Sequence, residues 1–139
     1  MRYWDSSAAV ALLVDEPAHR RATDLLAQDD AMLVWWATPV ECLSALLRRA
    51  RDGSLDEESL RVATQRLRAI AGEWHEVLPT PALRGVAERM LRVHALRAAD
   101  ALQLAAAMVA AEHDPPSLAF MCLDERLLAA ARSEGFIVE

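Results

Sequence analysis

Four acidic side chains are the residues of this sequence best suited to chemistry: Asp5, Glu41, Asp100 and Asp124. Each stands in a short apolar context, where a charged group is costly unless something compensates it. Four carboxylates that converged on one pocket would repel one another and would need a cation. Hard divalent cations prefer carboxylate oxygens, and Mg²⁺ keeps most of its waters when it binds. The pattern therefore indicates metal-assisted chemistry on a phosphate ester.

Each acid also has a purely structural explanation. Asp5 and Asp124 can cap helices, and Asp100 can complement a helix dipole. The segment from Thr38 to Glu41 has the form of a capping box, with Thr38 as the N-cap and Glu41 reaching back to it. For any one acid taken singly, the structural explanation is at least as good as the catalytic one, because caps are commoner than catalytic acids.

Length and composition predict one domain spanning residues 1–139, because the chain has 139 residues and 54% of them are hydrophobic. No apolar run approaches the ~20 residues that a membrane span needs. An acid at position 5 precedes any stretch that could serve as a signal peptide. Cys42 and Cys122 are far apart and have no metal-type spacing. We therefore expect a reduced, cytoplasmic protein that does not contact a membrane.

The charged residues exclude some classes of function. A net charge of −6 argues against a protein that coats nucleic acid. All 15 basic residues are Arg, and the absence of Lys excludes P-loop NTPases, whose Lys binds the phosphates. Any positive contact with a phosphate must therefore come from Arg, which suits bidentate recognition. Arg97, one turn before Asp100, is the best candidate for a phosphate contact near the acids.

Strands and helices are predicted to alternate along the chain. The predicted strands are 2–4, 32–36, 74–78, 118–123 and 136–138, and the predicted helices are 7–14, 17–28, 38–51, 56–71, 80–94, 99–112 and 124–133. This alternation predicts an α/β fold with a parallel sheet and helices on both faces. Ligands of such sheets bind beyond the carboxyl ends of the strands. Asp5, Glu41 and Asp124 follow strands and are expected at that edge, whereas Asp100 follows a helix and its position is not predicted.

Several segments together resemble one known family. They are the Asp-Ser-Ser after the first strand (5–7), the loop 15–17, Glu-Cys-Leu-Ser-Ala-Leu at 41–46, the alanine-rich helix around Asp100 (96–107) and Leu-Asp-Glu-Arg-Leu at 123–127. In this order and spacing they resemble the PIN-domain nucleases, and within them the VapC-type toxin ribonucleases of VapBC toxin–antitoxin systems. The resemblance spans nearly the whole chain.

The resemblance implies a three-layer α/β/α PIN-like domain with a short central parallel sheet. It implies that Asp5, Glu41, Asp100 and Asp124 bind Mg²⁺ or Mn²⁺ and that the activity is endoribonucleolytic hydrolysis of RNA phosphodiester bonds. Ser7 is a candidate for a supporting hydrogen bond to a carboxylate, as Arg97 is for a phosphate contact.

Two positions depart from the family pattern. Gln103 stands where the family often has His, and Cys122 stands where it often has Ser or Thr. A thiol donates a hydrogen bond poorly, but all four acids are present, which favours an enzyme. Two alternatives stay open: a catalytically idle PIN-like binding or assembly module, and a metal-dependent phosphatase or DNA nuclease.

The resemblance also implies partners. An RNA substrate, a cognate antitoxin, and a homodimer or toxin–antitoxin hetero-oligomer are expected. We expect an amphipathic antitoxin helix to occupy a groove between helices 17–28 and 38–51. The apolar residues predicted to line this groove are Leu25, Leu26, Leu43, Leu46 and Leu47.

Overall fold

Five short parallel strands form one sheet in the order β3-β2-β1-β4-β5. The strands are β1 (Arg2–Trp4), β2 (Met32–Trp35), β3 (His75–Val77), β4 (Ala119–Met121) and β5 (Ile137–Val138). The structure is a computed structural model that describes residues 1–139. The chain builds the sheet outward from β1 in one direction through β3, and then returns to the other side of β1 for β4 and β5.

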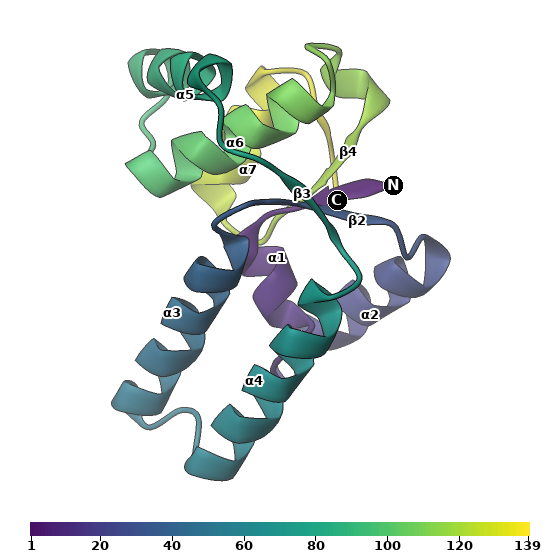
Figure 1. Cartoon of the computed structure of the whole chain (residues 1–139), viewed down its shortest axis with the longest axis vertical. Helices are drawn as coiled ribbons and strands as arrows, with labels where there is room; N and C mark the ends of the chain where they lie inside the picture. Colours follow the sequence, from purple (N-terminus) through teal and green to yellow (C-terminus); the bar gives the residue numbers. More distant parts are fainter.

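Helices cover both faces of this sheet. The helices are α1 (Ser6–Ala11), α2 (His19–Gln28), α3 (Thr38–Asp52), α4 (Glu57–Ala71), α5 (Pro81–Val93), α6 (Ala98–Ala110) and α7 (Glu125–Ser133), and a 3₁₀ turn spans Pro115–Ser117. In Figure 1, α5, α6 and α7 lie above the sheet and α1 to α4 lie below it, with α3 and α4 extending away as a pair. The predicted three-layer α/β/α fold is therefore confirmed. None of the helices combines the length and apolarity that crossing a membrane requires.

Strand residues alternate between two hydrophobic cores. Tyr3 packs into the core beneath α5, α6 and α7, whereas its neighbour Trp4 packs into the core formed with α1 to α4. Both side chains are completely buried, and the Tyr3 ring stacks on Phe120 with 5.3 Å between the ring centroids. Successive side chains of a strand point to opposite faces, so a strand of three residues is enough to anchor both layers.

Some predicted boundaries differ from the structure. Helix α1 ends at Ala11 rather than at Val14, although residues 12–14 remain buried. Helix α2 begins at His19 rather than at Pro17, because the Asp15-Glu16-Pro17 segment stays in the connecting loop. Strand β4 covers only the centre of the predicted strand 118–123.

The predicted capping box at the start of α3 is wrong. The N-cap of α3 is Ala37, and no side chain caps this helix. The Thr38 side chain is instead completely buried, and its hydroxyl accepts a hydrogen bond from Gln103. Glu41 also binds Gln103, so both residues are occupied by a contact with α6 rather than with each other.

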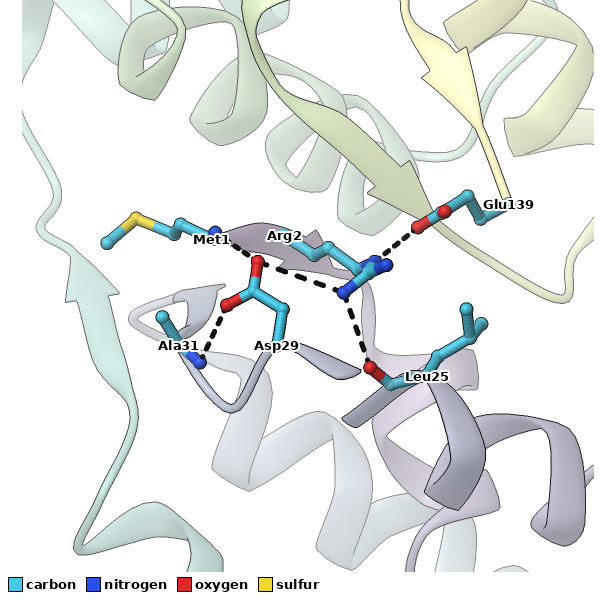
Figure 2. A network of polar contacts seen from close by, with 6 residues as sticks. All are labelled: Met1, Arg2, Leu25, Asp29, Ala31 and Glu139. Carbon is cyan, nitrogen blue, oxygen red and sulfur yellow. Dashed lines mark hydrogen bonds and ion pairs between the residues drawn. The ribbon is translucent and has the colours of Figure 1, made fainter. Parts of the chain in front are cut away.

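Ionic contacts hold the two ends of the chain together at the amino edge of the sheet. Figure 2 shows the terminal ammonium of Met1 paired with Asp29, beside the guanidinium of Arg2. Arg2 donates from Nε to Glu139 Oε2 at 2.5 Å and from Nη1 to the Leu25 carbonyl at 3.3 Å. This network fixes the beginning of β1, the central strand whose other end leads to Asp5.

Candidate active site

A cleft of about 940 Å³ is lined by all four predicted acids. Asp5 follows β1 directly, Glu41 lies in the first turn of α3, Asp100 lies in the first turn of α6, and Asp124 immediately precedes α7. Strands β1 and β4 are neighbours, although the chain leaves them toward opposite edges of the sheet. The cleft therefore lies at the topological switch point, where α/β sheets bind their ligands.

Asp5 is the most deeply buried of these carboxylates, with 3% of the residue exposed. Its Oδ1 accepts hydrogen bonds from the Ser7 hydroxyl at 2.7 Å and from the Ala8 amide at 3.1 Å, and its Oδ2 accepts one from the Ser7 amide at 3.2 Å. Burial raises the pKa of Asp5 to about 6, although the bonds from Ser7 and Ala8 act in the opposite direction. Asp5 forms no ion pair within the chain, so its charge is left without a basic partner.

Ser7 links the two strand ends that flank the switch point. Its hydroxyl donates to Asp5 and accepts a hydrogen bond from the Leu123 amide at 2.8 Å. The start of α1 is thereby joined to the loop after β4. The supporting hydrogen bond predicted for Ser7 is present, and its part in a reaction stays a prediction.

Asp124 caps α7, since its Oδ1 accepts from the Leu127 amide at 2.9 Å. Its own amide donates to Cys122 Sγ at 3.2 Å, and this sulfur lies 3.7 Å from the Ser7 hydroxyl. Burial, followed by the charge of Asp5, raises the pKa of the Cys122 thiol far above its usual range, so the thiol stays protonated. Cys122 therefore keeps a polar contact at this place, but a weak one.

Asp100, whose position the strand pattern does not predict, belongs to the same cleft. Burial and then the charge of Asp124 raise the pKa of Asp100, and the backbone and charge of Arg97 together with the charge of Arg126 oppose this rise. Asp100 and Asp124 are thus near enough to repel each other. Arg97 lines the cleft as predicted, at the N-cap position of α6.

Glu41 is held by Gln103, a residue that in the sequence alone is only a departure from the family pattern. Gln103 Nε2 donates to Glu41 Oε2 at 2.9 Å, and only 1% of Gln103 is exposed. The sequence feature that points to Gln103 is a polar amide inside the apolar run of α6, and residues 104–108 are all buried with it. A buried amide must find partners, but the sequence did not show which ones.

Four arginines also line the cleft: Arg48, Arg49, Arg97 and Arg126. Arg49 is bound to Glu16, with Nε and Oε1 2.7 Å apart. The other three form no ion pair within the chain. They are therefore free to bind an anion that enters the cleft.

The four carboxylates that line the cleft suit a hard divalent cation. Carboxylate oxygens are the ligands that Mg²⁺ and Mn²⁺ prefer, and a cation would relieve both the unpaired charge of Asp5 and the repulsion between Asp100 and Asp124. No three acidic, His or Cys side chains form a ready group of direct metal ligands. The carboxylates surround the cleft instead, which suits an ion that keeps part of its hydration shell.

The fold and the site together define a class: α/β domains with an all-parallel sheet and an acidic cleft at the switch point. The family model described as "PIN domain" matches residues 2–133, and the chain belongs to the PIN-domain family. The predicted family is thereby confirmed.

Two named ribonucleases and one solved structure are also similar to this chain. Ribonuclease VapC45 of Mycobacterium tuberculosis strain CDC 1551 / Oshkosh is 32% identical over 133 residues, which cover 96% of this chain and 90% of that protein. Ribonuclease VapC49 of M. tuberculosis strain ATCC 25618 / H37Rv has the same identity and coverage. The crystal structure of FitAcB from Neisseria gonorrhoeae superposes with a TM-score of 0.65 over 99% of this chain and 96% of that one. At 17% identity, this last similarity supports the fold alone.

Proposed function

We propose that this protein is a metal-dependent endoribonuclease and the toxin of a toxin–antitoxin pair, acting in the cytoplasm. The observation that carries the proposal is the gathering of Asp5, Glu41, Asp100 and Asp124 in one cleft that also contains unpaired arginines. Similarity over nearly the whole chain to two proteins named as VapC ribonucleases supports RNA as the substrate.

The four carboxylates would hold Mg²⁺ or Mn²⁺. Such an ion, when bound, supplies a Lewis acid that activates water and stabilises charge on the phosphate. Asp5 is suited to a fixed position because three hydrogen-bond donors orient its carboxylate. Asp124 uses Oδ1 as a helix cap, and its Oδ2 has no hydrogen-bond partner within the chain.

Arginines would bind the RNA backbone. An acidic cleft repels a polyanion, so substrate binding needs positive charge close to the carboxylates. Arg48 comes from α3 in one helical layer, whereas Arg97 and Arg126 come from the other layer. A guanidinium binds a phosphate through two parallel hydrogen bonds. Phosphate contacts from these three residues would thus come from both helical layers.

A cognate antitoxin is proposed to cover an apolar stripe on α3. Val40, Leu43 and Leu47 are spaced three and four residues apart and stay exposed, whereas Leu46 is completely buried. The expected groove between α2 and α3 needs correction, because α3 packs chiefly against α4 and α1. The stripe suits an amphipathic helix of an antitoxin or a second copy of this chain.

Single substitutions of the acids test the activity. Asp5→Asn and Asp124→Asn should abolish Mn²⁺-dependent cleavage of an RNA oligonucleotide while leaving the circular dichroism spectrum unchanged. Asp114→Asn is the matched control, because Asp114 is exposed and lies outside the cleft.

Parallel assays distinguish the alternatives. A DNA oligonucleotide and a phosphomonoester are tested with Mn²⁺ and with a chelator. Cleavage of DNA alone would identify a DNA nuclease, and release of phosphate alone would identify a phosphatase. An idle binding module would act on none of these substrates. Full RNA cleavage by both Asp variants would eliminate the proposed site.

A further inference from the structure

A buried chain of hydrogen bonds lies directly behind Glu41. The Tyr3 hydroxyl bonds to Gln103 Oε1 at 2.8 Å, and Gln103 Nε2 donates to Thr38 Oγ1 at 3.2 Å and to Glu41 Oε2 at 2.9 Å. These residues come from β1, α6 and α3: Gln103 of α6 bonds directly to α3 in the opposite helical layer, and Tyr3 of the central strand bonds to Gln103 from behind.

The chemistry of the groups fixes the direction of every bond. A carboxylate oxygen only accepts, so the amide nitrogen of Gln103 must be the atom that faces Glu41. The amide oxygen then faces Tyr3 and can only accept, which makes the Tyr3 hydroxyl the donor. The two N–H groups of the amide are used by Glu41 and Thr38. Reversing the amide would place two acceptors against each other at Glu41.

Packing leaves these groups little freedom. Tyr3, Thr38 and Gln103 are each 1% exposed or less, and the Tyr3 ring is stacked on Phe120. Burying an amide and two hydroxyls is costly unless each group is hydrogen-bonded. The free energy of the folded state therefore favours a single arrangement of these hydrogen bonds. Glu41 is the member of the network that lines the cleft.

We infer that Gln103 is a positioning residue that sets the orientation of the Glu41 carboxylate in the cleft, with Tyr3 fixing the orientation of Gln103. Glu41 Oε1 has no hydrogen-bond partner within the chain and is left for a ligand of the cleft. The inference rests on the proposed function, in which Glu41 is one of the carboxylates that hold the cation. Groups behind a metal ligand fix its orientation and tune its affinity in many metal sites.

Two variants test the inference without changing any of the four acids. Gln103→Met keeps a long side chain but removes the amide, and Tyr3→Phe removes only the hydroxyl. Binding of Mn²⁺ is measured by isothermal titration calorimetry, and RNA cleavage is measured in parallel. Loss of such a supporting contact is expected to weaken Mn²⁺ affinity by about 10-fold, within the range usual for groups behind metal ligands.

The double variant gives the sharper result. If Tyr3 acts through Gln103, Tyr3→Phe should have no further effect on Mn²⁺ affinity once Gln103 is Met, so the two effects should not add. Additive losses would mean that Tyr3 and Gln103 act separately, which would overturn the proposed order of action.

Phe136→Leu is the control for a general loss of stability. Phe136 packs against Phe120 in the same core as Tyr3, and it has no part in the hydrogen-bonded chain. The Phe136→Leu variant should have a lower melting temperature and an unchanged affinity for Mn²⁺. An equal loss of affinity in this control would reduce the role of Gln103 to stability alone and would overturn the inference.

The outcomes separate the inference from the function on which it rests. If the wild type binds Mn²⁺ and cleaves RNA, and both single variants match it, the inference is wrong and the proposed function stands. If the wild type neither binds Mn²⁺ nor cleaves RNA, the proposed function fails, and the role given to Gln103 fails with it.

Discussion

Residues in the cleft combine structural and chemical roles. Asp5 and Asp124 each cap a helix and also line the cleft, so the two explanations of these acids are both correct as far as position is concerned. Asp100 differs, because burial and the charge of Asp124 oppose its ionisation while the backbone and charge of Arg97 favour it. Asp100→Asn removes the charge but keeps a side-chain oxygen for the backbone of Arg97, so it tests the repulsion.

Asp100→Asn is expected to stabilise the metal-free protein and to weaken its response to metal. In a chelator, deleting the repulsion with Asp124 should raise the free energy of unfolding by about 0.5 kcal/mol, the size of a solvent-screened charge pair. With millimolar Mn²⁺, the melting temperature of the wild type should rise by mass action, and that of the variant should rise less. Differential scanning fluorimetry measures both effects.

Asp114→Asn serves as the control and should respond to Mn²⁺ as the wild type does. A wild-type melting temperature that does not depend on Mn²⁺ or Mg²⁺ would show that the carboxylates act only as separate helix caps.

Helices α5 and α7 are joined by a charged cluster that lies outside the cleft. Glu134, the C-cap of α7, accepts from Arg89 Nη2 at 2.5 Å and lies 2.7 Å from His94 Nε2. Burial alone would raise the pKa of Glu134, but the hydrogen bonds and charges of Arg89 and His94 outweigh it and lower the pKa below 4.5. The cluster therefore stabilises the ionised carboxylate.

Glu134→Gln is expected to destabilise the protein at neutral pH and to matter less in acid. Because the folded-state pKa is lowered, the stabilisation is fully present above the ordinary pKa and is lost as pH falls through the folded-state value. We expect a loss of about 1 kcal/mol at pH 7 that shrinks toward pH 3. Urea unfolding across this pH range measures the difference.

The control for this prediction is Glu88→Gln, an exposed acid on α5 that has no ion pair. It should change stability little at any pH. A difference between wild type and Glu134→Gln that grows in acid would contradict the proposed sign of the pKa shift.

At the scale of elements, local sequence predicts which helices and strands form better than how they contact each other. Apolar strand segments and the Pro or Gly residues at their ends place all five strands within a few residues of their observed bounds. The hydrogen bonds of Gln103 could not be predicted in the same way. Its partners Tyr3 and Glu41 lie 100 and 62 residues away, so only the folded structure brings them together. The capping box at Thr38 failed for the same reason, since a distant partner takes up its hydroxyl.

For the whole molecule, the strand order explains why acids so far apart in sequence share one cleft. The alternation of strands and helices predicts the carboxyl edge of a parallel sheet for Asp5, Glu41 and Asp124. It does not predict that β1 and β4 are neighbours, which places Asp5 and Asp124 beside the switch point. The position of Asp100 in the cleft depends on how α6 packs over the sheet, and hydrophobic periodicity does not predict that packing.

Exposed apolar residues on α3 lead to the prediction about partners. A toxic ribonuclease must be inhibited in its own cell, so expression of this chain alone should arrest growth, and co-expression with a cognate antitoxin should relieve the arrest and yield a co-purifying complex. Leu43→Ser combined with Leu47→Ser should weaken that complex, because each leucine is 39% exposed on the stripe that the antitoxin is proposed to cover. Size-exclusion chromatography and pull-down measure the complex.

Two controls make this result specific. Asp5→Asn should remove toxicity but leave antitoxin binding, since Asp5 lies at the base of the cleft and not on the stripe. Leu91→Ser on α5 changes a similarly exposed leucine in the opposite helical layer and should leave the complex intact. If the wild type is harmless when expressed alone and remains a monomer, the toxin hypothesis fails. RNA cleavage that depends on Mn²⁺ would then identify a housekeeping PIN nuclease.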